Sequence, residues 1–426
     1  MKMVVLLTGA TGFIGAHLAQ ALLDKGHRVL AAGRRACSDP RIGFIAADFA
    51  HDTEKAVWAA RLKGIDAVIN TVGIFREHGA QRFAALHRDA PCALFAACAD
   101  EGVALVLHVS ALGADAGAQS AYHRSKKAGD DCLARLPLRA CILQPSLVYG
   151  ADGASARQFR MLATLPCAVR FGTAAQLVQP VHIDDVAAAV CALLELPPAQ
   201  EVPPRLALAG PQPMPFPAYL AQLRQAMGLG RQPVLRLPTP LAHALARGAA
   251  LLPGSLLDPE ALRMLERGNC ADPAPLACLL GRPPRPVRSF IAQPYQARRD
   301  AQLDWLLPLL RLSLALLWIW TAIVSAWLYP AAASYALLER SGVPAALAPL
   351  LLYGAAALDL LFGLACLALP RRWRPRLWLA QAGLIVFYSL VILLRLPEFL
   401  FHPYGPLSKN LPILALLVLL YQLEKK

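Results

Sequence analysis

The sequence predicts an α/β domain with a doubly wound parallel sheet and a small second lobe, followed by a bundle of four transmembrane helices. Two observations lead to this prediction. Short apolar runs alternate with amphipathic stretches up to about residue 290, as they do in βαβ units. Long apolar stretches follow, and the chain of 426 residues is 57% hydrophobic with a mean hydropathy of +0.44, too apolar for an ordinary soluble protein.

The first domain is expected to span residues 1–290. Its predicted strands are Val4–Thr8, Arg28–Ala32, Phe44–Ala47, Ala67–Thr71, Ala104–Val109 and Ala140–Gln144. Apolar side chains recur at helical spacing from Ile14 to Leu22, which predicts the first crossover helix. Residues 151–290 are expected to contain the smaller, substrate-binding lobe. Proline and arginine dominate residues 281–299, where neither a helix nor a central strand is expected, and residues 291–305 are predicted to form a basic linker.

Residues 306–426 are predicted to form the membrane domain. The expected spans are Leu306–Tyr329, Ala345–Leu369, Leu377–Leu396 and Leu411–Leu423, of which the last is the shortest. Their lengths approach or reach the roughly 20 residues that cross a bilayer. Basic residues gather before the first stretch, between the second and third, and after the fourth, so the positive-inside rule predicts a multi-pass protein of the cell (inner) membrane with both termini in the cytoplasm. The alternative is a soluble α-domain with these stretches as core helices.

The net charge of +14 would suit either nucleic acid or an anionic membrane surface. The basic residues gather at the ends of the apolar stretches and no recognition motif is present, which favours membrane lipid and argues against nucleic acid. The ten cysteines show neither a C-x-x-C pair nor a metal-ligand spacing, so we expect reduced thiols, no disulfide framework and no metal site. The apolar start, residues 1–7, is too short for a secretory signal.

A glycine-rich turn follows the first expected strand. Glycines in such a turn allow a tight bend, close approach of the backbone to a pyrophosphate and close helix packing, and the helix N-terminus attracts the anion. The sequence therefore predicts a nucleotide site that includes Gly9, Thr11, Gly12, Phe13, Ile14 and Gly15. The alternative is a tight turn without a ligand.

The second expected strand leads into Arg34 and Arg35, where an NAD-specific site would usually offer a carboxylate to the ribose. Arginine pairs with the additional 2′-phosphate of NADP, so NADP(H) is favoured over NAD(H), with a solvated basic turn as the alternative. Asp48, followed by Phe49, is placed to accept a hydrogen bond from the adenine amino group. Its alternative is an ordinary turn aspartate.

Three further residues have the chemistry of a proton-transfer site. Ser110 follows an expected strand, and Tyr122 and Lys126 are four residues apart on an expected helix, hence on one face. The lysine ammonium would lower the pKa of the tyrosine phenol, which would then exchange a proton with a substrate oxygen that Ser110 polarises. Lys126 would also bond to the nicotinamide ribose. The alternative is an ordinary surface pair of tyrosine and lysine.

Together these residues resemble the short-chain dehydrogenase/reductase superfamily in its extended or atypical form, over roughly residues 3–290. The resemblance implies that Asn70 belongs to the catalytic set, where it orders a proton-relay water or the strand geometry. It also adds Thr71, Val72, Gly73 and Pro145 to the cofactor-binding residues, although Val72 departs from the family's usual Asn-Ala-Gly stretch. Residues 108–114 and 258–270 are similar to the branch that contains the 39-kDa-type accessory subunit of respiratory complex I, many of whose members bind nucleotide without demonstrated turnover.

The smaller lobe offers few polar anchors. Arg157, Gln158 and Arg160 would meet an anionic or polar substrate, with surface solvation as the alternative. Residues 240–252, with His243 and Arg247, form either an interfacial helix or part of a core. His182 precedes two aspartates, and the resemblance favours a turn and helix cap there over a metal site.

Within the membrane domain, the sequence suggests an ion pair between Arg311 and Asp359, because charges inside a span are costly without partners. Residues 306–426 resemble the DoxX-like four-helix membrane family, some of whose members are linked to quinone reduction or redox homeostasis. That resemblance suggests a quinone or another lipophilic partner, with plain anchoring as the alternative.

The leading functional prediction is a membrane-tethered, NADP-preferring oxidoreductase that acts on an apolar carbonyl, alcohol or quinone-linked substrate through Ser110, Tyr122 and Lys126. Two alternatives use the same nucleotide site. One is a non-catalytic accessory or assembly protein of a membrane respiratory complex, in which bound nucleotide raises stability. The other is a sensor of the NADPH/NADP ratio.

Overall fold

The computed structural model describes residues 2–171, 176–237, 244, 248, 259–403 and 405–425. The chain folds into two compact units, Met1–Ala301 and Gln302–Lys426. The boundary lies inside one long helix, α11 (Pro294–Ile323). The last residues of the segment 281–299, in which no helix is expected, are therefore helical. A proline can begin a helix because its missing N–H would be unpaired in the first turn.

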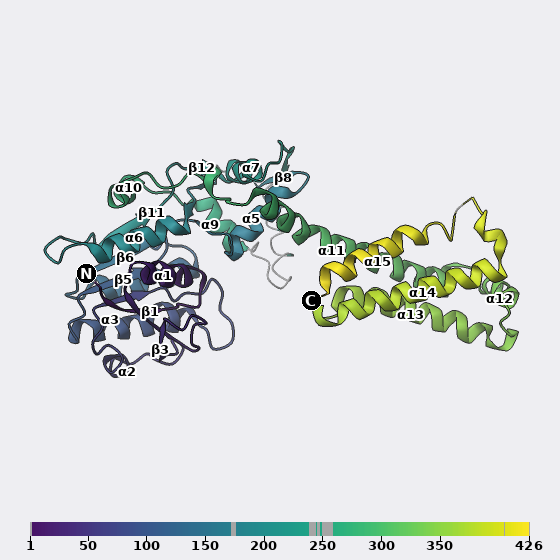
Figure 1. The fold of residues 1–426 in the computed structure, drawn as a ribbon, viewed down its shortest axis with the longest axis horizontal. Helices are drawn as coiled ribbons and strands as arrows, with labels where there is room; N and C mark the ends of the chain where they lie inside the picture. Colours follow the sequence, from purple (N-terminus) through teal and green to yellow (C-terminus); the bar gives the residue numbers. More distant parts are fainter. Residues whose placement is uncertain are drawn as a thin grey trace. The chain divides into compact units, whose positions relative to one another are not determined.

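A seven-stranded parallel sheet forms the centre of the first unit (Figure 1). The strands lie in the order β11-β6-β5-β4-β1-β2-β3, and every neighbouring pair is parallel. Their bounds are β1 (Val4–Thr8), β2 (Arg28–Gly33), β3 (Gly43–Ala46), β4 (Ala67–Asn70), β5 (Leu105–Val109), β6 (Ala140–Pro145) and β11 (Arg205–Leu208). The chain order reverses between β1 and β4, the position at which open parallel sheets bind ligands. This confirms the predicted α/β class.

Helices cover both faces of this sheet, because alternate residues of each strand point to opposite sides. Val5 and Leu7 of β1 pack with one set of helices, whereas Leu6 packs with the other. The first set is α1 (Phe13–Asp24), α6 (Ile183–Glu195) and α10 (Ala274–Leu280). The second is α2 (Lys55–Ala59), η1 (Ala84–Asp89), α3 (Ala90–Asp100) and α4 (Ala121–Ala134).

The smaller lobe consists of short strand pairs and helices around a third core that includes Tyr149, Tyr219 and Phe290. The pairs are β7 (Val148–Tyr149) with β10 (Val181–His182), β9 (Leu177–Val178) with β12 (Met214–Pro215), and β8 (Ala168–Phe171) with β13 (Val234–Leu237). The helices are α5 (Ala154–Thr164), α7 (Phe216–Ala226), α9 (Pro259–Arg267) and the short turn η2 (Val287–Ser289). His182 caps α6, since its Nδ1 accepts from the Asp184 N–H at 3.2 Å.

One cysteine prediction is wrong. Cys92 of α3 and Cys132 of α4 form a disulfide, with their Cα atoms 5.6 Å apart. They are 40 residues apart in the sequence, and the packing of α3 against α4 brings them together. Because α4 also carries Tyr122 and Lys126, the disulfide ties that helix to its neighbour. The other eight cysteines are free thiols.

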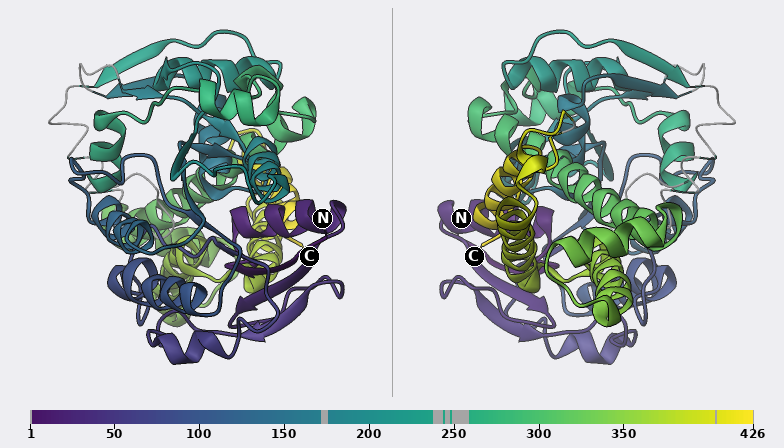
Figure 2. Two further views of the ribbon diagram at one scale, coloured as in Figure 1. Left: turned by 90° about the vertical axis from the view of Figure 1, so that its left-hand side faces the viewer. Right: turned by 90° about the vertical axis from the view of Figure 1, so that its right-hand side faces the viewer.

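The second unit is a bundle of apolar helices that lie side by side, as the right-hand view of Figure 2 shows. After α11 come η3 (Val324–Leu328), α12 (Ala331–Arg340), η4 (Ala345–Leu347), α13 (Ala348–Ala368), η5 (Arg371–Trp373), α14 (Arg374–Arg395), η6 (Pro397–Leu400) and α15 (Asn410–Glu424). Among the described residues, three helical segments are long and apolar enough to cross a membrane: Pro294–Leu328, Ala345–Ala368 and Arg371–Arg395. The fourth predicted span corresponds to α15, which has only 15 residues and is about 22 Å long. It falls short of a full span.

The predicted pair of Arg311 and Asp359 is also wrong. Asp359 is buried on α13, and its Oδ1 has no hydrogen-bond partner among the described residues, whereas Arg311 Nε lies 3.9 Å from Glu424 Oε1. The cause is the helix register. Gly363 of α13 lies against Ala315 of α11, and because Arg311 is one turn before Ala315, it faces the end of α13 rather than its middle.

Candidate nucleotide and catalytic site

The turn between β1 and α1 has the backbone geometry that its glycines predict. Gly9 adopts a φ of +74°, and its carbonyl accepts a hydrogen bond from the Gly12 N–H at 2.9 Å. A Cβ on Gly15 would lie 2.2 Å from the Gly9 oxygen, so only glycine lets the helix approach this closely. In the part of the chain that the structure describes, no side chain caps α1 at Gly12. The first N–H groups of α1 therefore remain available, as an anion at a helix N-terminus requires.

The other residues of the predicted phosphate-binding segment surround this turn. Thr11 is exposed, while Phe13 and Ile14 are half-buried on α1. The ring of Phe13 packs against the backbone of Gly150, where a Cβ would come within 2.7 Å of it. The helix start is thereby fixed against the beginning of the smaller lobe.

The predicted adenosine end lies along the ends of β2 and β3. These strands pair with Gly33 opposite Ala46, so Arg34 and Asp48 follow neighbouring strands at the same sheet edge. Arg34 and Arg35 are exposed, and neither forms an ion pair with a described carboxylate. Asp48 Oδ1 accepts from the Ala50 N–H at 3.0 Å, the bond expected of a turn aspartate.

Phe49 is buried against Trp58, with ring centroids 5.2 Å apart, and it belongs to the core beneath the sheet edge. Arg34 lies with its Nη2 2.8 Å from the side-chain amide of Gln81, and this edge thus carries two guanidinium groups without a described carboxylate beside them.

Asn70 ends β4 at the centre of the sheet and is completely buried. Its Oδ1 accepts from the Thr8 hydroxyl at 2.6 Å and from the Val72 N–H at 3.2 Å. The Thr71 hydroxyl donates to the Thr8 carbonyl at 2.7 Å. These bonds lock the ends of β1 and β4 together. Gly73 then passes so close to Lys126 that a Cβ there would lie 2.9 Å from the ammonium nitrogen.

Lys126 is held in place by backbone carbonyls. Its Nζ donates to the carbonyl oxygens of Val72 at 3.2 Å and Val109 at 3.1 Å, and only 3% of the residue is exposed. Burial lowers the pKa of Lys126 to about 8, although the nearby Asp130 opposes that shift. The lysine thus joins the strand ends of β4 and β5 to helix α4.

Tyr122 lies on the same helix beneath aromatic neighbours. Phe75 stacks on its ring with centroids 4.8 Å apart, and His87 approaches it edge-on at 5.7 Å. Burial raises the pKa of Tyr122 above its usual value, and the charge of Asp130 adds to that effect. The expectation that Lys126 lowers the pKa of Tyr122 is therefore wrong for the protein alone. Desolvation of the phenolate outweighs the attraction of an ammonium that already donates to two carbonyls.

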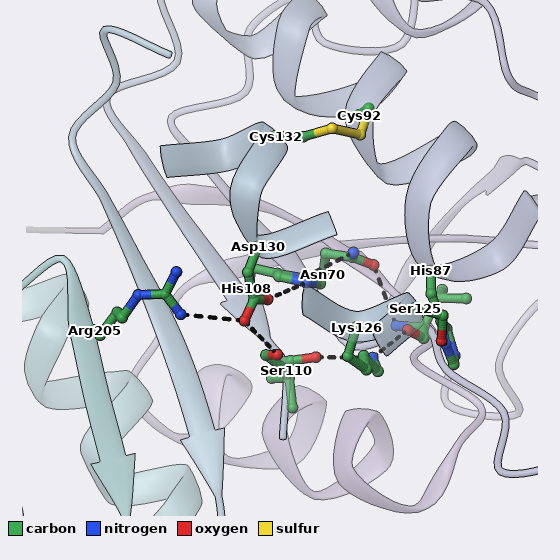
Figure 3. A network of polar contacts seen from close by, with 12 residues as sticks. Asn70, His87, Cys92, His108, Ser110, Ser125, Lys126, Asp130, Cys132 and Arg205 are labelled. Carbon is green, nitrogen blue, oxygen red and sulfur yellow. Dashed lines mark hydrogen bonds and ion pairs between the residues drawn. A yellow bond between two sulfur atoms is a disulfide. The ribbon is translucent and has the colours of Figure 1, made fainter. Parts of the chain in front are cut away.

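Ser110 and Pro145 complete the edge of the sheet. Ser110 follows β5, its N–H donates to the Leu143 carbonyl at 2.8 Å, and the Pro145 carbonyl accepts from the Leu112 N–H at 3.0 Å. The Ser110 hydroxyl donates to Asp130 Oδ2 at 2.8 Å, as Figure 3 shows. Asp130 was not among the predicted residues. The signal for it is its spacing, four residues after Lys126 on the same helical face.

His87 is a second residue that the sequence patterns did not reveal. Its Nε2 accepts from the Ile74 N–H at 3.0 Å, so Nδ1 carries the hydrogen and donates to Ser125 Oγ at 2.8 Å. The Ser125 hydroxyl donates to the Tyr122 carbonyl at 2.7 Å. Burial, assisted by the charge of Lys126, lowers the pKa of His87 to about 3. A neutral histidine thus fixes the backbone of Tyr122.

The substrate anchors predicted for the lobe have a less direct relation to the site. Arg160 donates from Nη1 to the Tyr149 hydroxyl at 3.2 Å and from Nη2 to the Ala151 carbonyl at 2.7 Å, so it is engaged by the lobe itself. Arg157 and Gln158 lie on the same helix, α5. The predicted interfacial segment 240–252, with His243 and Arg247, lies outside the described residues except for positions 244 and 248.

Comparisons with known proteins address both units. Residues 5–208 match the model of the NAD dependent epimerase/dehydratase family, and residues 315–418 match that of the DoxX-like family. The N-terminal domain is of the epimerase/dehydratase type and the C-terminal domain is DoxX-like. Both predicted resemblances are confirmed, and the apolar helices of the DoxX-like domain are those of a membrane protein.

Two curated relatives match the N-terminal domain. The ceramide reductase of Caulobacter vibrioides is 29% identical over 205 residues, which are 46% of this chain and 62% of that protein. Subunit 9 of the mitochondrial NADH dehydrogenase (ubiquinone) 1 alpha subcomplex of Arabidopsis thaliana is 29% identical over 210 residues, which are 45% of this chain and 50% of that protein. The matches thus span between half and less than two thirds of these relatives.

Solved structures share the fold at low identity. The UDP-glucuronic acid 4-epimerase of Bacillus cereus, in complex with UDP-glucuronic acid and NAD, has a TM-score of 0.51 and 21% identity, over 70% of this chain and 99% of that one. MoeE5, in complex with the same two molecules, has a TM-score of 0.51 and 20% identity over 70% and 99%.

Proposed function

We propose that this protein is a membrane-tethered, NADP-preferring oxidoreductase that interconverts a carbonyl and an alcohol on a lipophilic substrate. The observation that carries this proposal is the position of Lys126. Its ammonium bridges the carbonyls of Val72 and Val109, one helical turn from the Tyr122 ring and beside the strand ends next to the glycine turn. A proton donor and a cation thus meet at the edge where parallel sheets bind nucleotides.

Each proposed residue has a separate task. The nicotinamide, when bound, supplies or accepts the hydride at the substrate carbon. In the reducing direction the Tyr122 hydroxyl gives its proton to the substrate oxygen, and in the oxidising direction the phenolate takes that proton back. Lys126 stabilises the phenolate and holds the ribose. Ser110 hydrogen-bonds to the substrate oxygen, and buried Asn70 keeps the ends of β1 and β4 in register.

The proposed cofactor preference rests on Arg34 and Arg35. Both guanidinium groups lie at the end of β2 without a described carboxylate to neutralise them. They would pair with the 2′-phosphate of NADP(H), and Asp48 would face the adenine. The pyrophosphate would lie along the turn formed by Gly9, Thr11, Gly12, Phe13, Ile14 and Gly15. Thr71, Val72, Gly73 and Pro145 would line the nicotinamide end.

The proposed substrate class follows from the attached membrane domain and from the relatives. One relative is named ceramide reductase, which acts on a lipid, and the domain that follows here is DoxX-like. A carbonyl or alcohol on a lipid, or a quinone-linked compound, would reach such a protein from the bilayer. We also propose that the protein lies in the cell (inner) membrane with both ends of its membrane domain in the cytoplasm. Arg311, near the start of that domain, and Glu424, near its end, lie at the same end of the helix bundle.

The decisive test is turnover of purified full-length protein in mild detergent with NADPH and lipid carbonyls. Tyr122→Phe should abolish turnover and leave NADPH affinity nearly unchanged, because only the hydroxyl is removed. Tyr149→Phe is the matched control, since its hydroxyl serves Arg160 in the smaller lobe. Full activity in the Tyr122→Phe protein would refute the enzymatic role.

A second candidate is a non-catalytic nucleotide-binding accessory protein of a membrane respiratory complex. The observation that favours it is the Ser110 hydroxyl, whose hydrogen is directed to Asp130, together with the similarity to a subunit of NADH dehydrogenase. In that case NADPH should bind stoichiometrically without exchanging, and Gly12→Asp should impair the complex while Tyr122→Phe does not.

A further inference from the structure

The carboxylate of Asp130 is the end point of a buried hydrogen-bond network. Asp130 is fully buried, and its Oδ2 accepts from the Ser110 hydroxyl at 2.8 Å and from Arg205 Nη1 at 3.4 Å. Ser110 comes from the end of β5, Arg205 begins β11, and Asp130 lies on α4, so three distant segments meet here, as Figure 3 shows. Burying a carboxylate is costly unless such donors compensate for its lost hydration.

The second oxygen of Asp130 faces a histidine whose hydrogen can be placed. Asn70 Oδ1 already accepts from Thr8 and Val72, so its Nδ2 is directed toward His108 Nδ1, at 3.1 Å. His108 Nδ1 is therefore an acceptor, and its hydrogen is on Nε2. That Nε2 lies 3.5 Å from Asp130 Oδ1. Ser110 and Arg205 thus donate to Asp130 Oδ2, whereas His108 Nε2 and Asp130 Oδ1 face each other without a hydrogen bond, and neither atom has a partner among the described residues.

Resting on the proposed function, we propose that Asp130 is a positioning residue whose protonation decides whether the Ser110 hydroxyl can donate a hydrogen bond to the substrate oxygen. A serine hydroxyl has one hydrogen. With Asp130 ionised, that hydrogen is directed to Oδ2, so Ser110 has no hydrogen to offer the substrate oxygen. With Asp130 protonated, the carboxylic acid donates to Ser110 Oγ, and the serine hydrogen turns toward a substrate carbonyl, which needs a donor.

The proton balance of this switch is simple. One proton from solvent adds to Asp130, no bond to carbon changes, and the Ser110 hydrogen turns from Asp130 Oδ2 to the substrate oxygen. Low pH therefore supplies the Ser110 donor to the substrate oxygen in both directions of the reaction, and high pH withdraws it.

The surroundings of Asp130 place this titration within the physiological range. Burial raises the pKa of Asp130 to about 6, while the Ser110 hydrogen bond and the charges of Arg205 and Lys126 oppose the shift and Asp131 adds to it. The groups that face Asp130 are Ser110 and His108 from the β5 segment, Arg205 from β11, and Lys126 and Asp131 from α4, with His87 of η1 beyond Lys126. His108 is kept neutral, since burial lowers its pKa well below the usual value.

The first measurement is an infrared titration of the full-length protein in detergent, which needs no turnover. A band from a protonated carboxylic acid should appear as the pH falls through about 6 and should be absent in Asp130→Asn. Asp131→Asn is the matched control, because Asp131 pairs with Lys127 on the outer side of the same helix. Ser110→Ala should move the midpoint to higher pH, since it removes a hydrogen bond to the ionised form. An unshifted midpoint would overturn the coupling.

The second measurement is kcat/KM in both directions against pH. In both directions kcat/KM should step down as the pH rises through about 6, because the Ser110 donor is withdrawn, and this step should vanish in Asp130→Asn but persist in Asp131→Asn. Arg205→Gln should move the step to higher pH, because it removes a positive charge 3.4 Å from Asp130 Oδ2. A step that survives in Asp130→Asn refutes the proposal. Absence of turnover in the unaltered protein refutes the proposed function instead, and the infrared titration then tests the coupling of Asp130 to Ser110 by itself.

Discussion

Glu424 on α15 lies 3.5 Å from Arg374 on α14, measured between Oε1 and Nη1. The same carboxylate accepts from Trp378 Nε1 at 3.0 Å and has Arg311 Nε 3.9 Å away. Only 4% of the Glu424 side chain is exposed. One acidic residue thus joins three helices at one end of the bundle and neutralises part of the charge of two arginines.

Replacing Glu424 should therefore weaken the bundle. Glu424→Gln keeps an acceptor for Trp378 but leaves two partly buried guanidinium groups without a counter-ion, so we expect a loss of about 2–4 kcal/mol in the free energy of unfolding. Thermal unfolding of the protein in detergent, followed by circular dichroism, measures this loss. Glu339→Gln, at an exposed position, should have no effect. Equal melting temperatures for the two variants would contradict the role of Glu424.

The glycine turn gives a steric prediction. Gly15→Ala would place a Cβ 2.2 Å from the Gly9 oxygen, so α1 or the turn must shift. We expect NADPH affinity to fall at least tenfold and stability to fall by about 1–3 kcal/mol. Isothermal titration calorimetry and thermal unfolding are the measurements. Gly230→Ala, where a Cβ would meet nothing within 4 Å, should leave both unchanged.

The proposed cofactor preference can be tested at one side chain. Arg34→Ala should raise the Kd for NADPH about tenfold and change the Kd for NADH little, because a guanidinium–phosphate pair contributes on the order of 1–2 kcal/mol. Arg41→Ala is the control, since Arg41 already pairs with Asp39 at 2.6 Å. An unchanged ratio of the two dissociation constants in Arg34→Ala would refute the preference for NADPH.

The disulfide should contribute to the stability of the first domain. Replacing Cys92 and Cys132 by serine removes a cross-link that closes a 40-residue separation, so we expect a loss of about 2–4 kcal/mol in the free energy of unfolding. A reducing agent should lower the melting temperature of the unaltered protein and leave that of the double variant unchanged. Cys270→Ser, at an exposed free thiol, should retain the sensitivity to reduction. Insensitivity of the unaltered protein would contradict the cross-link.

His87 predicts how stability depends on acid. Its pKa is lowered from 6.5 to about 3 in the folded protein, so the unfolded chain binds the proton first. The stability that neutral His87 confers is complete above pH 6.5 and is lost as the pH falls from 6.5 toward 3, by up to about 1.4 kcal/mol per pH unit.

The His87→Gln variant, which does not titrate, should show a shallower decline of stability over this range in urea unfolding. His51→Gln, at an exposed turn, should follow the unaltered protein. Equal slopes for the unaltered protein and His87→Gln would show that His87 is not responsible.

What the sequence determined is local. The glycine turn, the alternating apolar strands and the Tyr122–Lys126 spacing are patterns of a few residues, and each follows from backbone geometry or helical periodicity alone. The long apolar stretches likewise predict a membrane domain by length and composition. These features suffice for the fold class and for the carboxyl edge of the sheet as the place of the nucleotide.

Tertiary structure alone decided which distant side chains meet. Asp130 accepts from Arg205, 75 residues away, and Cys92 reaches Cys132, because the order of strands and helices sets those neighbours. Arg311 approaches Glu424 instead of Asp359, because the register of packed helices depends on close contacts such as Gly363 against Ala315. The pKa of Tyr122 moves upward for the same reason, since desolvation is a property of everything that surrounds the phenol rather than of its spacing to one lysine.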